Sequence, residues 1–91
     1  MVYVISYDLN DRDKNYEGVS QAIIDVSGGY YVHRLDSTWI IKSSTLNATD
    51  VFGKIKPELD SNDTCLVIEV KNNKQGHFTK KEWEEINTLF S

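Results

Sequence analysis

Ninety-one residues, of which 40% are hydrophobic and 26% charged, can bury one two-layer core but leave no room for separate cofactor and substrate domains. The formal net charge is −4, from 10 basic and 14 acidic side chains, which disfavours broad binding to a nucleic-acid backbone because such binding uses a basic surface. No uncharged run reaches the roughly 18 residues of a membrane span, and the single cysteine, Cys65, has no partner for an intramolecular disulfide. We therefore expect one cytoplasmic domain over residues 1–91.

The first stretch, residues 2–9, is almost wholly apolar and rich in β-branched and aromatic side chains. This pattern is typical of a strand that is covered on both faces. Asp8 falls where such a strand leaves its sheet, the edge at which open α/β sheets commonly place their ligands. Two interpretations stay open for this carboxylate: a ligand or catalytic group, or a structural residue that starts a turn with Asn10 and Asp11.

Apolar residues recur at three- and four-residue steps over residues 16–26, which predicts an amphipathic helix of about three turns. Gly28 and Gly29 should end it, since glycine adopts the left-handed conformation that closes a helix. A nucleotide-binding glycine loop lies between a strand and a helix. These glycines follow a helix, so they do not indicate a nucleotide site.

Residues 30–35 and 38–42 are dense in aromatic and β-branched side chains and are separated by only Asp36 and Ser37, which predicts a β-hairpin. A second amphipathic helix should begin after Asn47 and run along apolar positions between residues 48 and 59. Pro57 removes a backbone hydrogen bond, so this helix should end or kink near residue 56.

A polar turn at residues 60–63 leads to a fourth predicted strand over residues 64–70. The chain then ends in a predicted helix over about residues 79–90. Thr79 and Glu82 match a capping box, and Phe78 can pack against Trp83 as a hydrophobic staple. The apolar side of this helix has to dock on a surface, and the pattern does not distinguish the chain's own sheet from that of a second copy.

The predicted order is strand, helix, strand, strand, helix, strand, followed by the terminal helix. Right-handed crossovers would make the first and third strands central neighbours in an antiparallel sheet, with both main helices on one face. The sequence therefore predicts an α+β fold: a ferredoxin-like βαββαβ sandwich over residues 1–71 with an extra C-terminal capping helix. The other face of the sheet and its edge strands would be available for dimerisation or a ligand.

Three stretches carry a family resemblance: MVYVISYDL at residues 1–9, LDSTW at 35–39 and VIEV at 67–70. They resemble the short bacterial and phage proteins labelled SinR family. The opening strand that ends in Tyr-Asp, together with the hairpin at residues 31–39, is also similar to the small CRISPR-associated adaptation nucleases, the family numbered two among those proteins. The resemblance covers about residues 1–70.

The resemblance implies a homodimer in which Asp8 of both subunits binds one Mg²⁺ for phosphodiester hydrolysis. Asp8 is then the catalytic and metal-binding candidate, and Tyr7, Arg34 and Ser37 are the substrate-binding candidates. A hard divalent ion prefers oxygen ligands, neutralises phosphate charge and can generate hydroxide. The chain departs from the family by lacking a strongly basic surface and by ending in a helix where the CRISPR proteins often add a strand.

Structural roles stay open for each of these candidates. Tyr7 can belong to the core, and Ser37 can hydrogen-bond its own turn. Arg12, Lys14 and Arg34 can form a small basic rim near the strand-end carboxylate, although neighbouring acids nearly cancel their charge.

Two functions follow as hypotheses. The first is a homodimeric, metal-dependent nuclease acting on nucleic acid through Asp8. The second is a non-catalytic dimeric binding module that captures a protein partner or small ligand, in bacterial or phage defence or counter-defence. Two tryptophans and five tyrosines suit the second hypothesis, because aromatic side chains are good interface anchors.

Overall fold

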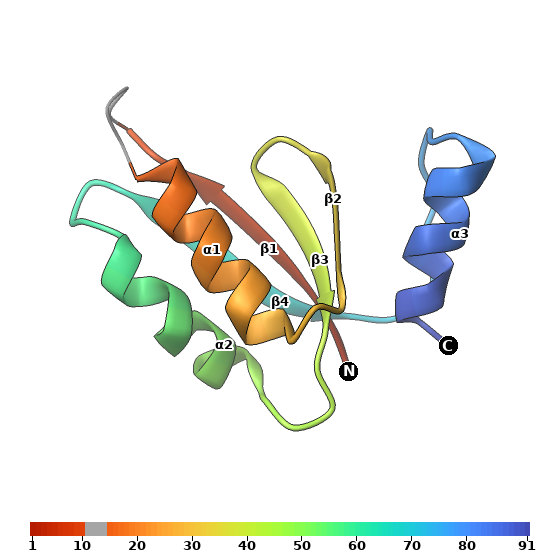
Figure 1. Cartoon of the computed structure of the whole chain (residues 1–91), viewed down its shortest axis with the longest axis horizontal. Helices are drawn as coiled ribbons and strands as arrows, with labels where there is room; N and C mark the ends of the chain where they lie inside the picture. Colours follow the sequence, from red (N-terminus) through yellow and green to blue (C-terminus); the bar gives the residue numbers. More distant parts are fainter. Residues whose placement is uncertain (11–14) are drawn as a thin grey trace.

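The computed structural model describes residues 1–10 and 15–91 and shows an α+β arrangement (Figure 1). The strands are β1 (Val2–Asp8), β2 (Tyr31–Leu35), β3 (Thr38–Lys42) and β4 (Thr64–Val70), and the helices are α1 (Tyr16–Ser27), α2 (Ala48–Ile55), the short 3₁₀ helix η1 (Lys56–Glu58) and α3 (Lys80–Leu89). Within these residues, none of the helices has the length and apolar composition needed to cross a membrane.

The four strands form one antiparallel sheet in the order β2-β3-β1-β4. Strands β1 and β3 are the central neighbours, as predicted, with Val2 opposite Lys42 and Ser6 opposite Thr38. Strand β4 runs along the other side of β1 over its whole length, so that Asp8 lies opposite Thr64. The strand order makes β4 an outer strand of the sheet.

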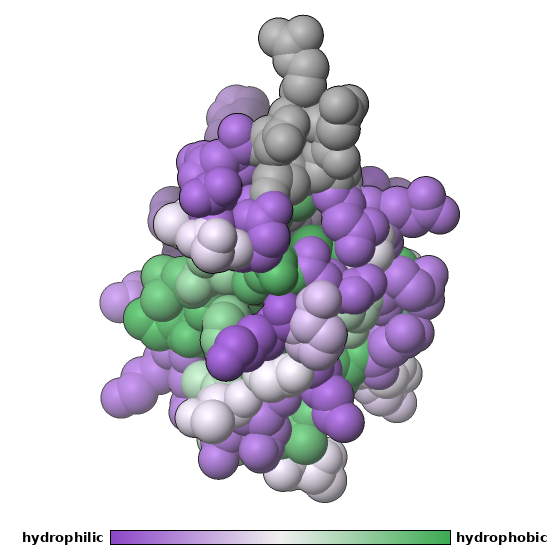
Figure 2. All heavy atoms as spheres, turned by 90° about the vertical axis from the view of Figure 1, so that its left-hand side faces the viewer, coloured by the Kyte–Doolittle hydropathy of each residue, from purple (hydrophilic) through white to green (hydrophobic). Residues whose placement is uncertain are grey.

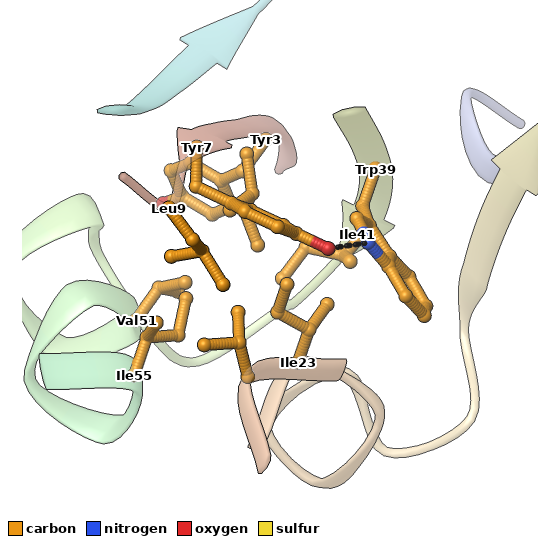
Figure 3. Packing of buried hydrophobic residues seen from close by; sticks show 10 residues of the cluster. Tyr3, Tyr7, Leu9, Ile23, Trp39, Ile41, Val51 and Ile55 are labelled. Carbon is orange, nitrogen blue, oxygen red and sulfur yellow. Dashed lines mark hydrogen bonds between the residues drawn. The ribbon is translucent and has the colours of Figure 1, made fainter. Parts of the chain in front are cut away.

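Helices α1 and α2 pack against each other on one face of the sheet (Figure 1). Because side chains alternate along a strand, every second residue of β1 points into this layer. Figure 3 shows Tyr3 and Tyr7 of β1 meeting Ile23 of α1 and Val51 and Ile55 of α2. This apolar cluster between sheet and helices is the main core of the molecule.

The helix ends follow the local sequence signals. Helix α1 is closed by Gly28 and Gly29, whose φ angles are 62° and 92°. Asn47 caps α2 through a capping box with Asp50. Pro57 lies in the 3₁₀ turn that replaces the last part of the predicted helix, and α2 ends at Ile55, which confirms the expected end near residue 56.

Helix α3 docks on its own sheet, on the face opposite α1 and α2. Thr79 and Glu82 form the predicted capping box, and the rings of Phe78 and Trp83 meet edge to face at 5.3 Å between centroids. Ile86 and Leu89 of α3 then pack in a second buried cluster, with Val32 of β2. The open question about its docking surface is thereby answered.

Candidate functional site

The face of the sheet opposite α1 and α2 is only partly covered. Helix α3 contacts β2 and β3, and the β1–β4 side of this face is left with large apolar side chains in solvent. Leu66 is 57% exposed and Ile68 48% exposed, and they lie opposite Ser6 and Val4 of β1. We call the surface formed by these four residues and Asp8 the open half-face. Figure 2 looks at the end of the molecule where β1 finishes, and it shows hydrophobic surface on the side away from α1 and α2.

Asp8 ends β1 and is exposed. Its neighbour Tyr7 points into the helix-covered core, so the alternation of a strand puts Asp8 on the open half-face. Together with Ser6 and Thr64 it lines a shallow hollow. Among the described residues, no hydrogen bond or ion pair engages its carboxylate. Its carboxylate is thus exposed at the end of β1 and unengaged within residues 1–10 and 15–91.

Tyr7 lies on the other side of the sheet from Asp8. Its side chain is 6% exposed, and its hydroxyl accepts a 3.2 Å hydrogen bond from the Nε1–H of Trp39 in the buried core (Figure 3). Its ring also lies 6.3 Å from that of Tyr16. This geometry gives Tyr7 a structural role and directs its hydroxyl away from any ligand held by Asp8.

The guanidinium group of Arg34 is engaged by α3. Its Nε donates a 3.0 Å hydrogen bond to Glu85 Oε2, and Glu82 Oε2 lies 3.9 Å from the same nitrogen. The bond to Glu85 and the negative charge of that carboxylate raise the pKa of Arg34. Arg34 therefore joins β2 to α3 and does not point into the hollow beside Asp8.

Ser37 lies at the same end of the sheet as Asp8, since its carbonyl accepts a 3.1 Å hydrogen bond from the backbone N–H of Tyr7. No described residue hydrogen-bonds its half-buried hydroxyl. The other two members of the predicted basic rim, Arg12 and Lys14, lie outside the described residues. Of the four predicted site residues, only Asp8 and Ser37 lie at the same end of the sheet with side chains that no described residue hydrogen-bonds.

Ser6 and Thr64 supply side-chain oxygens beside Asp8, and oxygen ligands suit a hard cation such as Mg²⁺. One chain contributes a single carboxylate, next to the hydroxyls of Ser6 and Thr64. The Ser6 hydroxyl already shares a 3.2 Å hydrogen bond with that of Thr38. Across residues 1–10 and 15–91, no group of three or more His, Cys, Asp and Glu side chains is placed to hold a metal ion. The donor set therefore amounts to half of a metal site, which a second copy or a substrate phosphate would have to complete.

The exposure of Leu66 and Ile68 was not foreseen from the sequence. Residues 64–70 are apolar at positions facing either side of the sheet, so the pattern does not tell which side is covered. Cys65, on the helix-covered side, is half-buried, and this burial raises the pKa of its thiol. An outer strand with apolar residues on both faces is a signal for an interface, but it can be interpreted only after the strand order is known.

A small apolar cavity of about 210 Å³ lies between the sheet and α3. Val32, Ile40 and Trp83 contribute to its walls. The ammonium group of Lys74, another lining residue, lies 4.3 Å from the centre of the Phe90 ring. This cavity is below the size of about 300–1,000 Å³ that is usual for small-molecule sites. It therefore does not compete with the open half-face as the main candidate for binding.

Comparison with known proteins gives no match: no family model, no curated protein and no solved structure matches the chain. The resemblance to SinR-like and CRISPR-associated proteins stays a prediction. Function is therefore inferred from Asp8, the open half-face and the outer strand β4.

Proposed function

We propose that this chain is a ferredoxin-like homodimer that binds a protein partner and catalyses no reaction. The ferredoxin-like assignment is supported by the strand order β2-β3-β1-β4 and by α1 and α2 on one face. The observation that carries the binding role is the exposure of Leu66 and Ile68 on the half of the sheet that α3 leaves open. Contiguous apolar surface of this kind marks interaction sites, since exposing it to water is unfavourable.

The positions of the predicted site residues favour binding over catalysis. A catalytic site needs several groups aimed at one reacting atom. The Tyr7 hydroxyl is hydrogen-bonded to Trp39 within the core and the Arg34 guanidinium group is engaged by Glu85, so neither functional group is aimed at the carboxylate of Asp8. The net charge of −4 also works against binding of a phosphodiester backbone.

The second candidate function is the metal-dependent nuclease, which the exposed carboxylate of Asp8 favours. Two copies of Asp8 facing each other would repel unless a cation lay between them. Bound Mg²⁺ would supply charge neutralisation of a phosphate and a source of hydroxide. In this function Asp8 holds the ion, and Ser37, at the same end of the sheet, orients a phosphate oxygen.

A cleavage assay separates the two functions. Purified protein is incubated with RNA and with DNA in Mg²⁺ or Mn²⁺, and wild type is compared with Asp8→Asn. Asp25→Asn is the matched control, because Asp25 is an exposed carboxylate on α1, on the other face of the sheet. The binding module gives no cleavage in any sample. Metal-dependent cleavage that Asp8→Asn abolishes and Asp25→Asn retains would replace the binding function by the nuclease.

A further inference from the structure

We infer that two copies of the chain pair through β4, so that their sheets join edge to edge into one continuous antiparallel sheet. This inference rests on the proposed dimer and specifies its interface. Strand β4 is the outer strand beside β1, and no other described strand pairs with its free side. An outer strand carries unpaired backbone N–H and C=O groups along that side, which is the template for pairing with another chain.

The composition of β4 leaves this edge unprotected. Proteins block outer strands with proline, lysine, bulges, short length or a covering element. Strand β4 has seven residues, Thr64–Val70, that include no proline, glycine or lysine, and Glu69 is its only charged residue. A long and largely apolar outer strand of this kind is suited to pairing.

The opposite outer strand, β2, is protected in the expected ways. It has five residues, carries Arg34, and has a register irregularity between Val32 and Leu35. Helix α3 also packs against it. The contrast between the two outer strands selects β4 as the one that receives a second copy.

The sequence of β4 is self-complementary in one register. With a two-fold axis at Val67, antiparallel pairing places Leu66 opposite the partner's Ile68, and Ile68 opposite the partner's Leu66. These four apolar side chains form a continuous row on the half of this face that α3 leaves open, and cross-strand apolar pairs stabilise a sheet. The same register places Lys71 opposite the partner's Asp63 at both ends of the interface, so opposite charges lie near each other there. Within its own chain the Asp63 carboxylate accepts hydrogen bonds from the backbone N–H groups of Asn10 and Asp60, so its contribution to the pairing is through charge.

Neighbouring registers are poorer. An axis at Leu66 places Glu69 opposite the partner's Asp63, and an axis at Glu69 places the two copies of Glu69 together. Like charges directly opposite each other destabilise a strand pair. An axis at Ile68 avoids this repulsion but loses both pairs between Lys71 and Asp63. Charge complementarity therefore favours the axis at Val67.

This pairing has two consequences for function. It joins the two open half-faces into one apolar surface, which is a larger docking site for a protein partner than one copy offers. It also separates the two copies of Asp8 by roughly 25 Å, from a strand spacing of about 4.8 Å and a rise of about 3.4 Å per residue. A dimer of this form cannot hold one metal ion between its two Asp8 side chains.

A designed disulfide tests the register. In the Val67-centred pairing Cys65 lies opposite the partner's Glu69, so Glu69→Cys places two cysteines in cross-strand contact, within the Cα separation of about 4.4–6.8 Å that a disulfide needs. Oxidation at mildly alkaline pH offsets the raised pKa of Cys65. We expect a covalent dimer on non-reducing gels that forms in full at stoichiometric oxidant. Wild type and the double variant Cys65→Ser, Glu69→Cys should stay uncrosslinked, because their equivalent cysteines would lie about 14 Å apart.

Light scattering of variants at the exposed apolar residues tests the β4 interface separately from the proposed dimer. Leu66→Lys and Ile68→Lys should convert the dimer to monomer, and Leu35→Lys is the matched control because Leu35 is 54% exposed but lies on β2. A wild-type dimer that survives both β4 substitutions and does not crosslink through Glu69→Cys would overturn the β4 interface and leave the dimer intact. A monomeric wild type at high concentration would overturn the dimer itself.

Discussion

The hydrogen bond between Tyr7 and Trp39 is the clearest single contribution to the core. Trp39 is 2% exposed, and its indole N–H is satisfied by the Tyr7 hydroxyl at 3.2 Å. Tyr7→Phe keeps the ring but leaves this buried donor without a partner, which costs about 1–3 kcal/mol. We expect the free energy of unfolding to fall by that amount in urea titrations followed by tryptophan fluorescence.

Tyr30→Phe is the control for this substitution, because Tyr30 is 64% exposed. Removing its hydroxyl should change the unfolding free energy by less than about 0.5 kcal/mol. Equal effects of the two substitutions would show that the buried bond contributes nothing to stability, and would reopen a ligand-contacting role for the Tyr7 hydroxyl.

Single residues also show how far the sequence can be interpreted. The apolar pattern of the first strand correctly predicted that Asp8 lies where this strand leaves the sheet. The engagement of Arg34 could not be foreseen, because its partner Glu85 is 51 residues away and only the docking of α3 brings the two together. Local patterns predict where a side chain leaves an element, whereas its partners depend on tertiary contacts.

Helix α3 is stabilised at its start by a reciprocal pair of hydrogen bonds. The backbone N–H of Thr79 donates to Glu82 Oε1 at 2.9 Å, and the backbone N–H of Glu82 donates to Thr79 Oγ1 at 3.2 Å. The hydrogen bond from the Thr79 backbone to the Glu82 carboxylate lowers the pKa of Glu82 below its ordinary 4.5, and the Thr79 side chain and, to a smaller extent, the charge of Arg34 lower it further. A lowered folded-state pKa gives stability that is complete above the ordinary value and is lost as the pH falls through the folded value.

We therefore expect α3 to loosen as the pH falls below 4.5. The measurement is hydrogen exchange of the α3 amides across this range in wild type and Glu82→Gln. The protection lost on substitution should be greatest at neutral pH and should shrink in acid, where the wild-type carboxylate is protonated as well. Glu84→Gln, at an exposed position of the same helix, is the matched control for the loss of one carboxylate. A constant difference for Glu82→Gln would mean that its charge does not support the cap.

The helices and strands themselves were largely predictable because their ends are marked locally. Gly28 ends α1, Asn47 begins α2, Pro57 breaks the helix after it, and Thr79 begins α3. The packing of these elements was predictable only where topology constrains it, as for the central pair β1 and β3. The path of the segment after Val70 determines which half of the sheet face α3 covers. No local sequence pattern predicts that path.

For the whole molecule, pairing through β4 makes folding depend on association. A dimer that unfolds to two separate chains gains about 1.4 kcal/mol of stability for each tenfold rise in protein concentration. For a dimer of this size that corresponds to about 3–6 °C in the unfolding midpoint. The wild-type midpoint, measured by circular dichroism over a wide concentration range, should rise accordingly.

The same measurement of the unfolding midpoint against protein concentration distinguishes a dimer joined through the sheet from a loose contact between two folded chains. Leu66→Lys should remove the concentration dependence, because a lysine at the two-fold seam would leave its charge beside the partner's Ile68. Leu35→Lys should keep it, since Leu35 lies on the opposite outer strand. A wild-type midpoint that does not change with concentration, in a protein that light scattering shows to be dimeric, would be incompatible with an interface built from β4. In that case the shared metal site at Asp8 would again be sterically allowed, since the Asp8 side chains of two copies would no longer be held apart by the joined sheets.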